Sequence, residues 1–313
     1  MPFDVTAAAP RHSTTPTTGR STMTMRTIFV PWWAGSASDA PLETALAVTR
    51  RAEAHLDVVY VQRSEAQVAT SLRAAAIGHA VTPEQVAQRG RLATGEARDR
   101  FASWRERHVL PDKIVGGQTH SVFSRWSERT GLPEQVIVRK GRISDLTVLA
   151  FPDLGGGLDR PLDAALFETG RPVLLAPAAG GTEPLRHVMI AWNGSIEATR
   201  AGAGALPLLR RAERVTVLMT VGLADQAFTN DPVAADLDLA DTLSWHGIEA
   251  RYGHVAADAE STASSLVQAA AERDAILLVM SVYTHSRVTA ASLGGVTGRV
   301  LCDPLGFPVL MGH

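Results

Sequence analysis

Few side chains in this sequence have the types and spacing that catalysis requires. His285 and Ser286 are adjacent and Asp303 lies downstream, and these are the residue types of a hydrolytic triad. Adjacent side chains seldom act as nucleophile and base for one another, and no Gly-x-Ser-x-Gly turn surrounds Ser286. The sequence therefore predicts no catalytic residue.

Metal and thiol chemistry have equally little support. The 10 histidines include no H-x3-H or H-E-x-x-H pair, the spacings that place two zinc ligands on one face of a helix. Cys302 is the single cysteine, so neither an intrachain disulfide nor a thiolate cluster can form. A buried core thiol is favoured over a redox sensor. We expect no metal site.

A segment near the C-terminus has the composition of a phosphate-binding turn. Gly294 and Gly295 are followed by Val296 and Thr297, and Arg287 precedes them. Glycines let the backbone approach an anion, and N–H groups at a helix N-terminus bind it. Two interpretations stay open: a nucleotide or other phosphate-bearing ligand with Arg287 near the phosphates, or a turn whose glycines serve packing only.

This segment lies within an internal repeat. Arg26–Ser36 and Arg186–Ser195 both run from a short apolar segment through Trp to Gly-Ser, which predicts a buried strand and a tight turn. A stretch with helical periodicity follows in both halves and ends in the same tetrapeptide, at Arg50–Glu53 and Arg210–Glu213. Three later pairs of strands correspond in order: Leu56–Val61 with Val215–Val221, Asp145–Ala150 with Ala275–Met280, and Arg171–Ala176 with Phe307–Met311. The sequence is therefore a duplication.

The repeat predicts an α/β fold with two tandem, doubly wound domains. Apolar strands that alternate with helices indicate a parallel sheet covered on both faces, with five strands in each half. Right-handed crossovers place a ligand at the carboxyl ends of the strands, near the topological switch point. We expect a disordered tail over residues 1–24, with translation start at Met1, Met23 or Met25 left open, a first domain over 25–178 and a second over 186–313.

Two aromatic and edge features complete the predicted architecture. Trp32, Trp33 and Trp192 end the first strands, where an indole packs in the core or stacks on a ligand ring. Val173–Ala176 and Val309–Met311 are apolar final strands, and an unpaired apolar edge invites aggregation. We predict that these two strands pair with one another and relate the halves by a pseudo-two-fold axis. A homodimer of such chains stays open.

The second half resembles a universal stress protein domain, and the whole chain resembles the tandem members of that family. The likeness is carried by IAWNGS at residues 190–195 and by the segment from Val279 to His313. It implies a Rossmann-like fold of the adenine-nucleotide-binding type. Some members of the family bind ATP and others do not.

The family's ATP-binding pattern, Gly-x2-Gly-x9-Gly-(Ser/Thr), falls on Ser281, Thr284, Gly294 and Gly295. The third glycine is kept, the first two positions carry side chains, and the hydroxyl position is a glycine. Thr297 offers a hydroxyl two residues later. The resemblance thus implies an altered nucleotide loop.

The turn after the first strand of each half also departs from the family. Asn193, followed by Gly194, stands where the family usually has an Asp that accepts hydrogen bonds from the nucleoside. Asn keeps one acceptor oxygen and gains an NH2 donor. In the first half Trp33 or Ala34 takes that place, and Gly155–Gly157 do not reproduce the spaced glycines. We expect the first site to be lost and the second to be altered.

Composition and resemblance together predict a binding protein. A net charge of −2 argues against a nucleic-acid surface, and no apolar run is long enough to span a membrane. We expect a cytoplasmic stress-response protein that binds ATP or another adenine nucleotide with Mg²⁺ in its second half, or a protein partner, without dedicated catalysis. Weak ATPase activity, a nucleotide-hydrolysing or adenylate-transferring enzyme, and a scaffold with vestigial pockets stay open.

Overall fold

The architecture repeats strand–helix units along the chain. The computed structural model describes residues 25–34, 38–64, 67–68, 82–111, 122–152, 159–180, 186–222, 232–257, 261–282, 295–302 and 305–313. The first half consists of β1 (Thr27–Trp33), α1 (Ala40–Ala52), β2 (His55–Gln62), α3 (Pro83–Arg107), β3 (Ser124–Thr130), α4 (Pro133–Gly141), β4 (Leu146–Ala150), α5 (Arg160–Glu168) and β5 (Val173–Ala176). The second consists of β6 (His187–Trp192), α6 (Ile196–Leu209), β7 (Arg214–Gly222), α7 (Pro232–Trp245), β8 (Ala250–Ala257), α8 (Ser261–Glu272), β9 (Leu277–Ser281), α9 (Gly295–Cys302) and β10 (Val309–Gly312).

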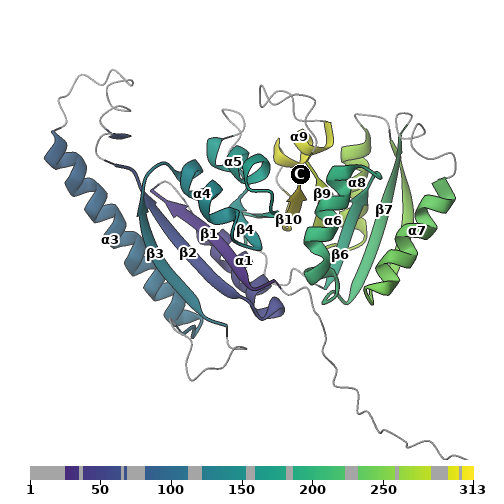
Figure 1. The fold of residues 1–313 in the computed structure, drawn as a ribbon, viewed down its shortest axis with the longest axis horizontal. Helices are drawn as coiled ribbons and strands as arrows, with labels where there is room; N and C mark the ends of the chain where they lie inside the picture. Colours follow the sequence, from purple (N-terminus) through teal and green to yellow (C-terminus); the bar gives the residue numbers. More distant parts are fainter. Residues whose placement is uncertain are drawn as a thin grey trace, which may run out of the picture.

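All these strands belong to one sheet that runs through both halves. Its 10 strands lie in the order β3-β2-β1-β4-β5-β10-β9-β6-β7-β8, so each half contributes five strands in the same relative order. Pairing within each half is parallel. In Figure 1 the halves lie side by side, with α3 at one outer end and α7 at the other. The predicted duplicated α/β fold is confirmed.

The two halves join through their final strands. β5 and β10 pair antiparallel, with Val309 opposite Leu175, Leu310 opposite Leu174 and Met311 opposite Val173. The predicted pairing of the two apolar edges inside one chain is therefore confirmed. Because the strands of each half are parallel, this antiparallel junction makes the two halves run in opposite directions.

Helices cover both faces of the sheet, as the doubly wound topology requires. Side chains alternate between faces along a strand, and Ile28 and Val30 of β1 belong to one buried cluster while Phe29 belongs to another. The first cluster includes side chains of α1, α3, α6 and α7. The second includes side chains of α4, α5, α8 and α9. Each half therefore sends two helices to each face.

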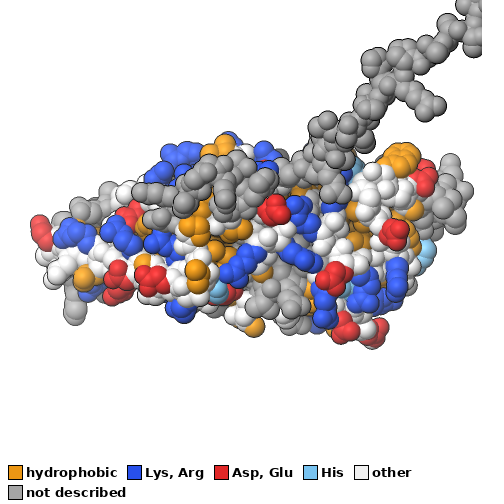
Figure 2. Space-filling view, turned by 90° about the horizontal axis from the view of Figure 1, so that it is seen from below, with side chains coloured by type: hydrophobic (Ala, Val, Ile, Leu, Met, Phe, Trp, Pro, Cys, Tyr) orange, Lys and Arg blue, Asp and Glu red, His pale blue; other side chains and the backbone are white. Residues whose placement is uncertain are grey.

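The halves differ most in the length of one helix: α3 has 25 residues, whereas α7, its counterpart in the second half, has 14. It begins with a capping box between Thr82 and Gln85 and buries Phe101 and Trp104 against the sheet. Most of its charged side chains face solvent, as expected for this Arg- and Glu-rich stretch. On the face seen in Figure 2, basic and acidic side chains are interspersed. No helix in the described part of the chain is long and apolar enough to cross a membrane.

Candidate functional site

The topological switch point of the second half lies between β6 and β9. These strands pair in parallel, with Val188 opposite Leu277 and Ile190 opposite Val279. The helix that follows β6, α6, covers one face of the sheet, whereas α9, which follows β9, covers the other. In doubly wound sheets, ligands bind outside the carboxyl ends of the two strands at such a point.

At this switch point a tight turn leads from β6 into α6. The backbone N–H of Ser195 donates to Oδ1 of Asn193 over 3.1 Å, and Gly194 has a left-handed φ of 74°. The hydroxyl of Ser195 then caps α6 by accepting from the N–H of Ala198 over 3.1 Å. The Asn193 oxygen, which was expected to accept a hydrogen bond from a nucleoside, therefore already accepts one from the backbone. The NH2 group of Asn193 can still donate to a ligand.

The end of β9 lies at the same edge of the sheet. Ser281 is the last residue of β9 and is half-buried. Because β6 and β9 are parallel neighbours, Ser281 lies at the same edge as Asn193 and Gly194. Helix α9 begins at Gly295, the second residue of the predicted glycine pair, so the helix N-terminus expected there is present.

The remaining predicted site residues differ in their placement. Val296 is half-buried and packs against the second core cluster. Thr297 is only 2% exposed, so its hydroxyl lies in the interior and is not open to solvent. Thr284, Arg287 and Gly294 lie outside the described residues, as do His285, Ser286 and Asp303. Their predicted roles stay predictions.

A buried histidine lies at the opposite end of β6. The ring nitrogens of His187 are 2.8 Å from the carbonyl oxygen of Arg273 and 2.9 Å from Oγ1 of Thr216. Burial is the main cause that lowers the pKa of this imidazole. Both nitrogens are used in connecting β6 to β7 and to the end of α8, so His187 has a structural role. The sequence position of His187, at the start of a strand, did not predict its contacts with Thr216 and Arg273.

The carboxyl ends of the strands in the first half carry different residues from those in the second half. Trp33 ends β1 and Ala34 follows it, so no acidic group stands there, while Gly155–Gly157 lie outside the described residues. The structure has a cavity of about 280 Å³ beside this end, between β2 and α3. Sequence reasoning missed this cavity, because it depends on how closely α3 approaches the sheet.

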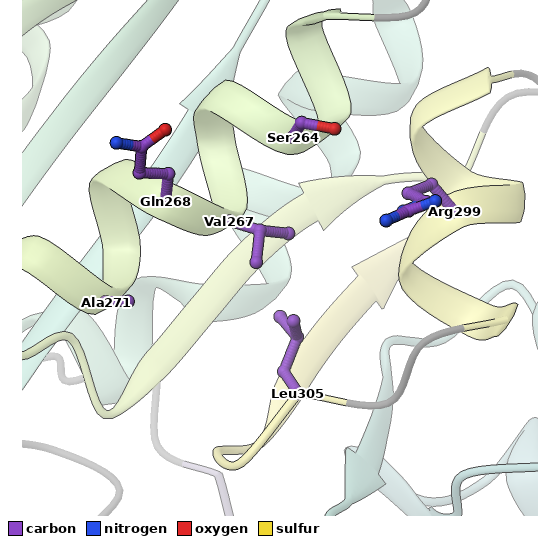
Figure 3. Close-up of a pocket in the computed structure, with 6 residues that line it drawn as sticks. All are labelled: Ser264, Val267, Gln268, Ala271, Arg299 and Leu305. Carbon is purple, nitrogen blue, oxygen red and sulfur yellow. The ribbon is translucent and has the colours of Figure 1, made fainter.

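A second, smaller cavity lies away from both switch points. It measures about 220 Å³ and is lined by Ser264, Val267, Gln268, Ala271, Arg299 and Leu305. Figure 3 shows that α8 and α9 form its two sides, with Leu305 from the segment before β10. The amide of Gln268 donates to Glu272 over 2.8 Å. None of the predicted site residues is among those that line it.

Comparisons with known proteins identify the fold. No family model matches the sequence, and the search of curated proteins found no match. A universal stress protein from Archaeoglobus fulgidus DSM 4304 has a TM-score of 0.63 at 12% identity, over 92% of this chain and 96% of that chain. A functionally unknown protein from Pseudomonas aeruginosa PAO1 has a TM-score of 0.51 at 15% identity, over 92% of each chain. The resemblance to universal stress proteins is confirmed as a likeness of fold that spans both halves.

Proposed function

We propose that this protein is a universal-stress-type binding protein that acts in the stress response and holds a small phosphate-bearing ligand, first of all an adenine nucleotide, in its second half. The proposal rests on two observations: the Asn193–Gly194 turn and the end of β9 lie at one switch point, and α9, the next described helix after β9, begins at Gly295. The full-length likeness of fold to a solved universal stress protein supports it.

The chemistry available at this switch point is anion recognition. The first N–H groups of a helix have no partner within the helix and carry a partial positive charge, so they attract phosphate oxygens. The left-handed Gly194 keeps the opposite turn free of a Cβ, and the NH2 group of Asn193 adds a neutral donor. Mg²⁺ would enter with the phosphates of the nucleotide.

The proposal includes binding without turnover. In the described part of the chain no three His, Cys, Asp or Glu side chains are grouped so that they could hold a metal ion. The carboxamide of Asn193 is a poor general base because it carries no titratable proton acceptor near neutral pH. A cytoplasmic location remains part of the proposal, based on the single cysteine.

Calorimetric titration with ATP, ADP and AMP, each with Mg²⁺, tests this function. We expect saturable binding that Gly294→Leu abolishes, because a bulky side chain there would keep the phosphates from the backbone. Gly155→Leu, in the glycine run of the first half, is the matched control and should keep the affinity. Unchanged affinity of Gly294→Leu would place the site elsewhere.

A phosphate-release assay on the same samples separates the alternatives. Binding without release is expected. Release at a rate that Gly294→Leu removes would favour a nucleotide-hydrolysing enzyme, and the absence of binding to the unmodified protein would favour a scaffold with vestigial pockets.

A further inference from the structure

The first half contains a cavity beside the nucleotide site that the sequence predicts to be lost, since Trp33 and Ala34 are among its lining residues. It measures about 280 Å³ and lies where β1 and β2 end, below the N-terminal half of α3. Its wall is mainly apolar and includes Trp33, Tyr60, Val61 and Val86. Tyr60, Val61 and Val86 are buried, so this wall is part of the packed structure.

Packing fixes the aromatic wall in place. Tyr60 is only 2% exposed, and its ring stacks on Trp126 of β3 with 5.7 Å between the ring centroids. Trp126 in turn stacks on Phe101 of α3 at 5.2 Å. The ring of Tyr60 is therefore held as an apolar surface between the sheet and α3.

A close approach of α3 to the end of β2 defines the rim. A Cβ at Gly90 would stand 2.8 Å from Nε2 of Gln62, the flexible end of that side chain. Gly95, one and a half turns further along the same helix, has nothing within 4 Å. Helix α3 therefore lies closer to its neighbours at the cavity than at Gly95.

The mouth of the cavity carries positive charge. Arg63 and Arg89 both line it, both are exposed, and neither forms an ion pair with a described residue. No acidic residue is among the described residues that line the cavity. By contrast, Arg98 of the same helix pairs with Glu128 over 2.6 Å, and Arg100 pairs with Asp39 over 2.8 Å.

We propose that this cavity binds a small amphipathic anion, an aromatic or short aliphatic carboxylate. The apolar body would lie against Tyr60 and Val86, and the carboxylate would meet Arg63 and Arg89 at the mouth. The cavity volume of about 280 Å³ lies just below the usual range for small-molecule pockets, about 300–1,000 Å³, which favours a ligand smaller than a nucleoside triphosphate. Guanidinium groups recognise carboxylates by paired, charge-assisted hydrogen bonds.

Calorimetry with naphthalene-1-acetate and naphthalene-1-acetamide tests this site, because the two probes share their apolar body and differ in charge. We expect one molecule of the carboxylate to bind per chain, at least ten-fold more tightly than the amide. The double variant Arg63→Gln/Arg89→Gln should remove that preference. Arg91→Gln, on the same helix but not lining the cavity, is the control and should preserve it.

A filling variant tests the location. Ala93→Phe should abolish binding of both probes, whereas Gly95→Phe should leave it unchanged, since that position has open space around it. Equal affinity for the two probes, or full binding by Ala93→Phe with intact circular dichroism, would overturn the proposal. Loss of fold in Ala93→Phe would leave the exposed arginine variants as the deciding test. Nucleotide binding by the second half is measured separately and does not bear on this result.

Discussion

Gly312 of β10 and Ala201 of α6 approach so closely that a Cβ on Gly312 would stand 2.6 Å from the Cα of Ala201. At this contact α6 packs directly against β10, the strand that pairs with β5 and so joins the two halves. Nearby, a Cβ at Gly204 would stand 3.1 Å from the ring of Pro172, which precedes β5 in the first half. Helix α6 is thus packed tightly against the junction.

Gly312→Ala should therefore destabilise the protein by about 1–3 kcal/mol, the usual cost of overpacking a filled interior. Gly306→Ala is the matched control, because nothing lies within 4 Å of a Cβ at that position. Chemical denaturation measures both. If the two variants were equally stable, the tight seating of α6 on β10 would be contradicted.

A buried ionic cluster predicts a second effect on stability. Asp57 of β2 is 4% exposed and accepts two hydrogen bonds from Arg125 of β3, at 3.0 and 2.8 Å, while Nζ of Lys140 lies 2.6 Å away. Asp57→Asn leaves both cations without this counter-charge. Because the Arg125 side chain is 57% exposed, we expect a loss of about 1–3 kcal/mol at neutral pH, less than for a fully buried pair. Asp163→Asn, on the part-exposed α5, should cost far less.

The same cluster predicts a pH dependence. Burial alone would raise the pKa of Asp57, but the hydrogen bonds and charges of Arg125 and Lys140 outweigh it and hold the pKa below its usual value. A carboxyl with a lowered folded pKa contributes stability above its unfolded pKa of about 3.9 and loses it as the pH falls through the folded value. The gap between wild type and Asp57→Asn should therefore narrow below pH 4. A constant gap from pH 7 to pH 3 would contradict this account.

His187 should give the protein a different acid sensitivity. Burial lowers the pKa of His187, so the unfolded chain takes up a proton at a higher pH than the folded chain does. The stability is then complete above about pH 6.5 and falls as the pH drops from there through the lower folded pKa. His187→Leu should flatten the curve of unfolding free energy between pH 7.5 and 5.5. His246→Gln, at the end of α7, is the control, and an equal slope in wild type and His187→Leu would argue against the role of His187.

Much of this architecture follows from the sequence because the signals are local or repeated. The apolar runs predicted the strands, the duplication predicted two halves, and the apolar edges at Val173–Ala176 and Val309–Met311 predicted their pairing. The glycine pair Gly294–Gly295 indicated a helix N-terminus, and α9 begins within that pair, at Gly295. These inferences depend on neighbouring residues and on the need to bury apolar surface.

The features that were missed depend on contacts between residues distant in sequence. Asp57 meets Lys140 only because the register of β2 and the packing of α4 bring them together. The cavity below α3 depends in the same way on the contact between Gln62 and Gly90. Neither has a local sequence signal, since each partner alone is an ordinary residue in a strand or a helix.

Two substitutions at Asn193 test whether its side-chain oxygen holds the turn after β6. Asn193→Ala removes the acceptor for the Ser195 N–H and should cost about 1 kcal/mol of stability. Asn193→Asp keeps that acceptor and should retain the stability of the native protein. Denaturation of both variants checks this, and equal losses would show that the carboxamide oxygen does not hold the turn.

Amide hydrogen exchange with and without ATP and Mg²⁺ tests the central claim, that the switch point between β6 and β9 holds a phosphate-bearing ligand. Bound phosphate would engage the first N–H groups of α9 and order the Gly194 turn. We expect slower exchange in peptides covering 193–196 and 294–298, with unchanged exchange at the carboxyl ends of β1 and β4. Protection confined to the first half, or none in either half at saturating nucleotide, would contradict it.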